Sequence, residues 1–129
     1  MLVYRVEQTK TEVGPYTKRK HLNSKKSSKC LSEMYEAHNN DNYPCWLDDG
    51  LPRQDCYSAG FSNHNDLLNW FSGWFKQLHN LRFKVVIYET DTVNESWSGK
   101  QINFKKGTKI REYRIPEFLM LKHETLSRL

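Results

Sequence analysis

The fold is decided by residues 61–88, which read FSNHNDLLNWFSGWFKQLHNLRFKVVIY. In the first two thirds of this stretch, apolar side chains recur three or four residues apart, the spacing of one face of a helix; they are Leu67, Leu68, Phe71, Trp74, Phe75 and Leu78. Oxygen-bearing side chains suited to a helix N-cap precede them: Ser62, Asn63 and Asn65. We therefore predict one amphipathic helix from about residue 64 to 79. Residues 83–88 are short and rich in β-branched and aromatic residues, which predicts a buried strand.

Further strands are indicated on both sides of this stretch. Residues 2–8 alternate in the period of two that is typical of a strand. Residues 101–104 and 110–115 alternate in the same way, and Gly107 between them predicts two strands joined by a tight turn. We expect residues 91–99 to form a polar loop. Pro116 should end the last strand, leaving residues 117–129 as a terminal helix or a tail. The chain is therefore expected to be an α+β protein, with a small mixed or antiparallel sheet packed against one main amphipathic helix.

Length and composition bound the class of protein. A chain of 129 residues predicts a single domain, residues 1–129, and the high aromatic content of 13% predicts a core built on a few large rings. The longest apolar run, Val85–Tyr88, is far too short to cross a bilayer, and no signal peptide is apparent. The three cysteines form no CxxC pair, and the five histidines have no ligand spacing, so no disulfide framework and no metal site is expected. These features favour the cytoplasm.

The net charge of +5 is unevenly distributed. Lysines and arginines crowd residues 17–29, a segment without hydrophobic periodicity, which we expect to be a mobile basic loop before a short helix at about residues 31–38. Nonspecific binding of nucleic acid through this loop is one interpretation. The segment lacks the interleaved aromatic residues that stack on bases, so a solvated run of charge is the favoured one.

Two tryptophans of the predicted helix are candidates for a partner interface. Adjacent helical residues point about 100° apart, so the crowded set of rings cannot all share one buried stripe. We expect Trp70 to lie at the edge of the stripe, with Trp74 beside it. Trp70 then either anchors a protein partner, a role in which tryptophan is enriched, or is covered by the N-terminal loop.

Several short motifs follow one another in an order that resembles a family of small bacteriophage proteins. They are YRVE at residues 4–7, GPY at 14–16, GFS at 60–62, LLNWF at 67–71 and the pair Gln101 and Phe104 in a Gln-x-x-Phe strand. The resemblance implies a phage accessory protein in the host cytosol that binds or modulates a host component, for example to interfere with host defence or metabolism.

The order of elements also resembles the fold of the mono-ADP-ribosyltransferases. The matching positions are Tyr4 and Arg5 on the first strand, Ser62 and Asn63 in the Ser motif, and Gln101 at the start of a later strand. This resemblance implies that these five residues line a cleft for NAD or ADP-ribose. The catalytic position, which holds a glutamate in that family, is Gln101. An amide keeps the hydrogen bonds of the carboxylate but lacks its charge, so binding of a nucleotide is favoured over catalysis of ADP-ribose transfer.

Each of these residues also has a purely structural interpretation. The structural interpretations are favoured: Arg5 as a surface or salt-bridged arginine, paired for example with a loop aspartate, and Ser62 as a helix cap. Three functions therefore stay open: a binder of a host protein or nucleotide, an active mono-ADP-ribosyltransferase that uses NAD, and a nonspecific nucleic-acid binder.

Overall fold

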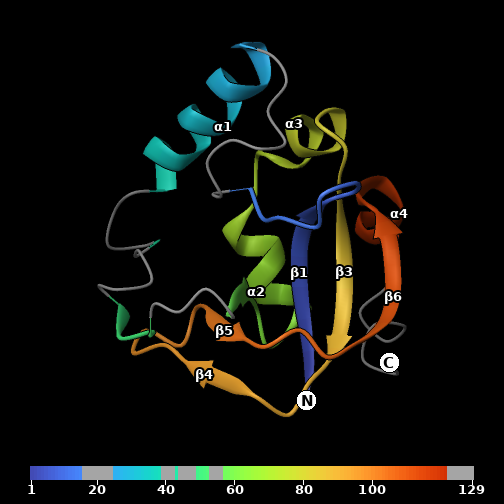
Figure 1. Cartoon of the computed structure of the whole chain (residues 1–129). Helices are drawn as coiled ribbons and strands as arrows, with labels where there is room; N and C mark the ends of the chain where they lie inside the picture. The colour runs from blue at the N-terminus through green and yellow to red at the C-terminus, as the bar shows by residue number, and fades with distance from the viewer. Residues whose placement is uncertain (16–24, 39–42, 44–48, 53–56, 122–129) are drawn as a thin grey trace.

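The computed structural model describes residues 1–15, 25–38, 43, 49–52 and 57–121. These residues form an α+β protein with two antiparallel sheets of three strands, ordered β1-β3-β6 and β2-β5-β4 (Figure 1). The elements along the chain are β1 (Leu2–Gln8), α1 (Lys25–His38), β2 (Ser58–Gly60), α2 (His64–Trp70), α3 (Phe75–Asn80), β3 (Phe83–Glu89), β4 (Val93–Glu95), β5 (Ile102–Phe104), β6 (Thr108–Arg114) and α4 (Ile115–Met120).

The main sheet has β3 at its centre, as expected for the most apolar strand. Val85, Val86 and Ile87 of β3 are fully buried, and β1 pairs with β3 along its whole length from Leu2 to Gln8. The strands predicted at residues 2–8 and 83–88 are therefore confirmed. One face of this sheet packs against α2, α3 and α4 to form the larger core, in which Leu67, Leu78 and Phe118 are buried (Figure 1).

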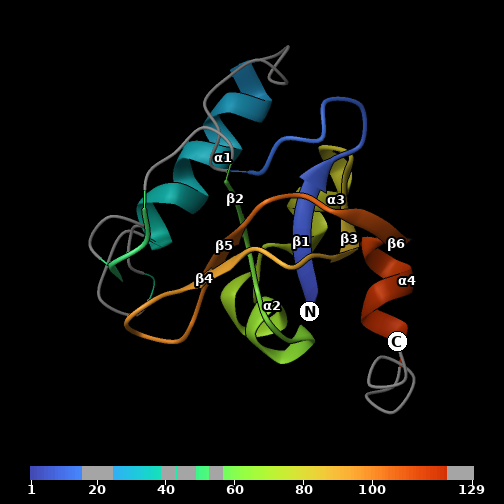
Figure 2. The same cartoon turned by 60° about the horizontal axis from the view of Figure 1, so that its bottom comes forward.

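The smaller sheet crosses the opposite face of the main sheet at one end (Figure 2). A second core of buried side chains joins the two sheets: Val3, Val86, Tyr88, Ile102 and Phe104. An isolated bridge between Tyr4 and Phe61 also ties β1 to the end of β2. Gly60 permits this close crossing, because a Cβ atom there would lie 2.6 Å from Cγ1 of Val3.

The prediction of a single helix over residues 64–79 is wrong. The structure divides it into α2 and α3, which are separated by a turn at residues 71–74. Gly73 lies in this turn with φ of 87°, a left-handed conformation that favours glycine. The break changes the direction of the chain, so that the apolar residues of both short helices pack into the same core.

The hairpin predicted between residues 101–104 and 110–115 is also wrong. β5 pairs with β2 and β4, whereas β6 pairs with β3 in the other sheet. Gly107 allows the chain to cross the end of β3, because a Cβ atom there would lie 2.2 Å from the carbonyl oxygen of Glu89. The polar loop predicted at 91–99 contains β4, a strand of three residues that exists through its pairing with β5.

The remaining helices also differ from the prediction. α1 begins at Lys25, inside the segment 17–29 that was expected to be a mobile loop; residues 17–24 lie outside the described residues. It extends the short helix predicted at residues 31–38, and its residues Leu31 and Met34 join the larger core. α4 begins at Ile115, one residue before the proline, and residues 122–129 of the predicted helix or tail lie outside the described part. Among the helices described, none has the length and apolar character needed to cross a membrane.

Candidate functional site

Arg5 lies inside the protein on β1, with 6% of its surface exposed. Its Nε donates to Oε2 of Glu7 at 3.0 Å, and its Nη1 donates to the carbonyl oxygen of Ala59 at 2.8 Å. Burial lowers the pKa of the Arg5 guanidinium, and the adjacent Glu7 carboxylate opposes this shift. Arg5 is therefore a salt-bridged residue that links β1 to β2. Its partner is the residue two positions along the same strand, not the loop aspartate that the sequence suggested.

Glu7 is the centre of this buried polar cluster. It is fully buried, and besides Arg5 it accepts a hydrogen bond from the Tyr88 hydroxyl at 2.8 Å and faces Nζ of Lys106 at 3.4 Å. Burial and the hydrogen bond to Glu7 raise the pKa of Tyr88. These donors compensate the buried charge of Glu7, which lies on the same face of the main sheet as Val3 and the smaller sheet.

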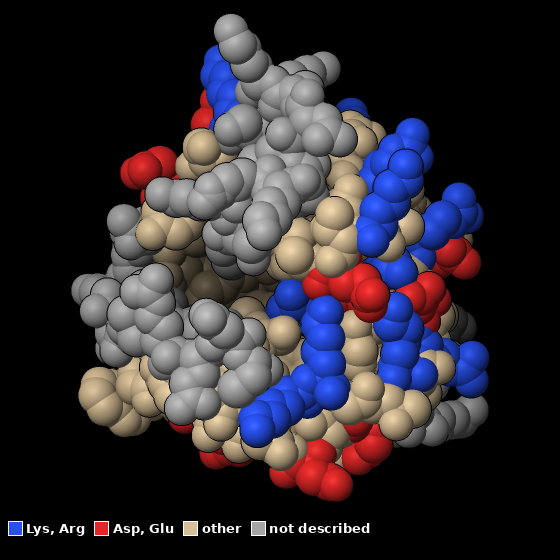
Figure 3. Space-filling model, viewed as in Figure 1, with Lys and Arg blue, Asp and Glu red and all other residues tan. Residues whose placement is uncertain are grey.

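The exposed part of the same face carries both signs of charge. Glu112 accepts from Nζ of Lys84 at 2.6 Å and from Nζ of Lys109 at 2.7 Å, and Lys109 also contacts Glu12 at 3.2 Å. Basic and acidic side chains are correspondingly interleaved over this face in Figure 3. This pattern is typical of a network of surface ion pairs rather than of a surface for nucleic acid.

Asn63 and Ser62 lie before α2. Asn63 is the N-cap: its Oδ1 accepts from the backbone N–H of Asp66 at 2.9 Å, and its Nδ2 donates to Oδ2 of Asp66 at the same distance. The structural interpretation of Ser62 as the cap is therefore wrong, since the next residue takes that position. Tyr4, which was also expected to line the cleft, lies in the larger core.

Gln101 holds a turn in place. Its Nε2 donates to Oδ2 of Asp49 at 2.9 Å, and Asp49 also accepts from the backbone N–H of Ser98 at 2.8 Å and from its hydroxyl at 2.7 Å. Burial alone would raise the pKa of Asp49, but these hydrogen bonds from Gln101 and Ser98 outweigh it and hold the pKa below its usual range. The backbone of Asp49 accepts a further bond from Trp97 at 2.9 Å. The turn between β4 and β5 is thus fixed to Asp49.

Trp97 is the most exposed aromatic residue in the described part of the chain, with 82% of its surface accessible. One side of its indole lies against Gly50, where a Cβ atom would be only 2.3 Å from the ring. Gly50 has a φ of 77°, so both the contact and the backbone require glycine. The other side of the indole faces solvent on a turn that Asp49 fixes.

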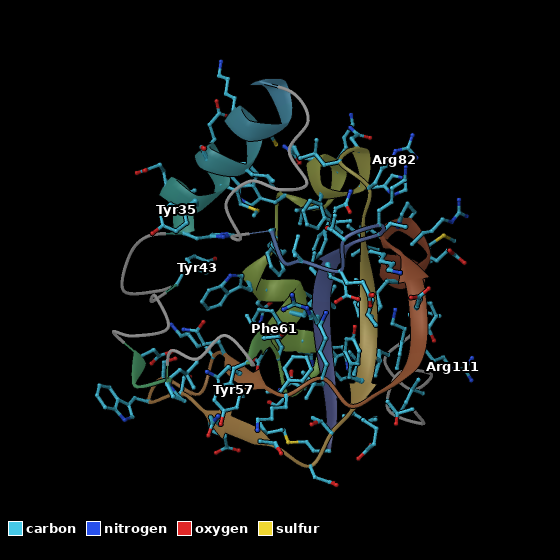
Figure 4. The ribbon with its side chains drawn as sticks, viewed as in Figure 1. Tyr35, Tyr43, Tyr57, Phe61, Arg82 and Arg111 are labelled. Atoms are coloured by element: carbon cyan, nitrogen blue, oxygen red, sulfur yellow. The ribbon has the colours of Figure 1, made fainter. Side chains whose placement is uncertain are left out.

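A pocket of about 270 Å³ lies between α2 and the β4–β5 turn. Its described lining residues are Tyr43, Asp66, Asn69, Trp70 and Lys100. Figure 4 shows Tyr43 beside α2, and its ring meets the ring of Trp70 edge to face, with 5.1 Å between the centroids.

The two tryptophans of the predicted interface are not exposed. Trp70 is only 6% exposed instead of lying at an exposed edge, and it is covered by Tyr43 and by His38 at the end of α1. Trp74 is half-buried against the larger core. The alternative expectation was cover of Trp70 by the N-terminal loop; among the described residues the cover comes from His38 at the end of α1 and from Tyr43.

The five residues expected from the transferase resemblance do not line this pocket. Arg5 belongs to the Glu7 cluster and Gln101 to the Asp49 cluster, and the hydrogen bonds given above share no residue. Two of its described lining residues lie close in sequence to expected ones: Lys100 precedes Gln101, and Asp66 follows Asn63 by three positions. The sequence did contain a signal for this pocket: Asp66, Asn69 and Trp70 are three and four residues apart, which places them on one side of a helix.

These features define a small two-sheet α+β protein with a polar and aromatic surface pocket among its described residues. The chain belongs to the Bacteriophage T4 Y00F protein family, whose model matches residues 1–116. The resemblance to a family of small bacteriophage proteins is therefore confirmed. No curated protein and no solved structure matches the chain, so the resemblance to mono-ADP-ribosyltransferases has no structural relative to support it.

Proposed function

We propose that this phage protein is an accessory protein that binds a host protein, with Trp97 as the anchor of the interface. The observation that carries the proposal is an indole that is 82% exposed on a turn held by four hydrogen bonds to Asp49. Tryptophan is enriched among the residues that dominate binding energy. An anchor that is already ordered loses little conformational entropy when the partner binds.

The positions of the expected catalytic residues weigh against a transferase. The guanidinium of Arg5 donates hydrogen bonds to the Glu7 carboxylate and to a backbone carbonyl, and the amide of Gln101 donates a hydrogen bond to the Asp49 carboxylate. The carboxylates in these two arrangements, Glu7 and Asp49, are buried and already accept hydrogen bonds from neighbouring side chains, whereas the transferase mechanism uses a carboxylate that faces the developing positive charge of the substrate. The pocket volume of about 270 Å³ also lies below the range of roughly 300–1,000 Å³ that is common for ligand pockets, and NAD is a large dinucleotide.

Nucleic-acid binding has less support than protein binding. Most of the described basic residues of the main sheet are paired with acidic ones, as Lys84 and Lys109 are with Glu112. A surface that neutralises phosphates needs cations that are available to release counterions. Most of the basic segment 17–29 lies outside the described residues, so the proposal does not draw on it.

The test compares two single variants of equally exposed residues. Met120 on α4 is 85% exposed and lies on the other side of the molecule from the β4–β5 turn (Figure 1). Wild-type, Trp97→Ala and Met120→Ala proteins are immobilised and exposed to host lysate, and the bound proteins are quantified by mass spectrometry. A tryptophan that dominates an interface contributes about 2 kcal/mol or more, so Trp97→Ala should lower the affinity for a captured host protein by roughly 30-fold.

Met120→Ala should capture the same host protein as the wild type. Equal capture by Trp97→Ala would refute the assigned interface, provided that circular dichroism shows both variants folded. A host protein that becomes labelled when the chain is mixed with labelled NAD would refute the binder interpretation itself and favour transferase activity.

A further inference from the structure

β4 is an edge strand of the smaller sheet, in which the order is β2-β5-β4. Figure 1 shows no other helix or strand beyond it at the bottom of the view. Its pairing with β5 continues past both of its ends. The N–H of Lys105 donates to the carbonyl oxygen of Thr92 at 3.1 Å. The N–H of Ser96 donates to the carbonyl oxygen of Gln101 at 3.3 Å. Residues 92–96 therefore form one extended edge.

Backbone groups along this edge alternate between β5 and the outside. In an antiparallel pair, successive residues direct their N–H and C=O groups alternately toward the partner strand and away from it. Thr92 and Ser96 bond to β5, so Val93 and Glu95 direct their backbone groups away from it. Among the described residues, no hydrogen bond outside the β4–β5 ladder reaches the backbone of Val93 or Glu95. The N–H and C=O groups of these two residues can therefore pair with a further strand.

The Trp97 indole lies at one end of these backbone groups. The N–H of Trp97 faces the same side as those of Val93 and Glu95, but it already donates to the carbonyl oxygen of Asp49 at 2.9 Å. An added strand therefore pairs with Val93 and Glu95 and then reaches Trp97, which is 82% exposed. Two residues of a strand span about 7 Å, so a side chain of the added strand can cover the indole.

The same edge carries negative charge. Asp91 precedes it and Glu95 lies within it; both side chains are exposed, and neither forms an ion pair with a described residue. The ammonium group of Lys105, the residue after β5, lies over the ring of Tyr57 at 6.0 Å from its centroid. Residues 91–97 contain no basic side chain. A partner that lies along this edge should therefore carry lysine or arginine side chains.

We propose that β4 takes up an extended basic segment of a host protein as a fourth strand of the smaller sheet. This binding mode rests on the host-protein interface proposed above, with Trp97 as its anchor. Backbone hydrogen bonds to a sheet edge supply the affinity in such complexes, and side chains beside the edge supply the specificity. Pairing of β4 with β4 of a second copy is disfavoured, because it places Asp91 and Glu95 beside the same carboxylates of the other copy.

Three synthetic peptides of about ten residues probe the edge. One alternates lysine with threonine, one alternates glutamate with threonine, and one is the lysine peptide with every backbone amide methylated. The lysine peptide should bind the full chain about 10-fold more tightly than the glutamate peptide, and the methylated peptide should not bind, because it has no N–H donors. Hydrogen exchange measured by NMR should be fast at the amides of Val93 and Glu95 in the free chain and about 10-fold slower with the lysine peptide.

Variants of Glu95 separate the backbone from the charge. Glu95→Pro removes an outward N–H without breaking the ladder with β5, so it should weaken binding of the lysine peptide by about 10-fold or more. Glu95→Gln keeps the N–H and should weaken binding by only about 3-fold. Glu33→Gln removes an exposed carboxylate on α1 and should bind the peptide as the wild type does. Slow exchange at the amides of Asn94 and Ser96 would show that Glu95→Pro retains β4.

The proposal is overturned if the lysine peptide does not bind at millimolar concentration, if the methylated peptide binds as tightly, or if Glu95→Pro with β4 intact binds as the wild type does. Capture from host lysate distinguishes this result from failure of the proposed function. Loss of the captured host protein with Trp97→Ala but not with Glu95→Pro would refute strand addition and leave the interface at Trp97. Loss with Glu95→Pro but not with Trp97→Ala would support strand addition and refute Trp97 as the anchor.

Discussion

Replacement of Glu7 by alanine should be among the most destabilising single substitutions in this protein. Glu7 has no exposed surface, and it is the acceptor for Arg5 and Tyr88. Its removal leaves the Arg5 charge, which is 94% shielded from solvent, without its carboxylate. Breaking a buried ion pair in this way costs about 3–5 kcal/mol, a large part of the roughly 5–15 kcal/mol that stabilises an ordinary domain.

Urea unfolding followed by tryptophan fluorescence measures this loss. With a slope near 2 kcal/mol per molar urea, the midpoint of Glu7→Ala should fall by about 2 M. Glu112→Ala is the matched control, because Glu112 accepts from two lysines but is 43% exposed, and exposed pairs contribute about 1 kcal/mol or less. Equal losses in the two variants would refute the assignment of Glu7 as the buried centre of the cluster. The double variant Arg5→Met with Glu7→Leu should recover most of the stability, because apolar replacement removes both buried charges.

Three further predictions concern other elements of the fold. Burial lowers the pKa of His38, so the folded state favours the neutral ring. The contribution of His38 to the unfolding free energy should therefore be constant above pH 6.5 and fall as the pH drops below 6.5 towards the folded pKa. His38→Phe should show a smaller fall between urea titrations at pH 7.5 and at pH 5.5. Gly107→Ala should cost about 1–3 kcal/mol or prevent folding, because its Cβ would meet the Glu89 carbonyl oxygen, and an unchanged thermal midpoint would contradict the close approach. Asn63→Ala removes the cap that accepts from the Asp66 N–H and should cost about 1 kcal/mol in urea, whereas Asn63→Ser, which keeps a capping oxygen and places no second charge beside Asp66, should retain most of that stability.

The strands that form the centre of the fold could be predicted because their side chains alone specify them. Residues 83–88 are apolar and β-branched, and residues 2–8 alternate, so the local pattern and the final environment agree. The broken helix was missed because its apolar spacing continues through Gly73, and only the positive φ of that glycine distinguishes two helices from one. β4 has three residues and owes its existence to β5, which no local pattern can indicate.

The candidate site was harder to predict because its parts come from distant segments. The pair of Arg5 with Glu7 was within reach, since residues two apart on a strand lie on the same face. The contact of Gln101 with Asp49 joins positions that are 52 residues apart, and only the path of the chain brings them together. For the same reason the exposure of Trp97 was not apparent from a segment that reads as a polar loop.

The position of β6 at an edge of the main sheet affects how the protein behaves when it is concentrated. An edge strand of seven residues offers backbone N–H and C=O groups to any other strand that approaches, which is a common route to aggregation. β6 carries Lys109, Arg111, Glu112 and Arg114, its pairing with β3 shifts in register between Ile87 and Tyr88, and Arg111 points away from the sheet (Figure 4). The charges and the irregular register both oppose the addition of a strand from a second molecule. The sequence of β6 therefore helps to keep the protein dispersed as well as folded.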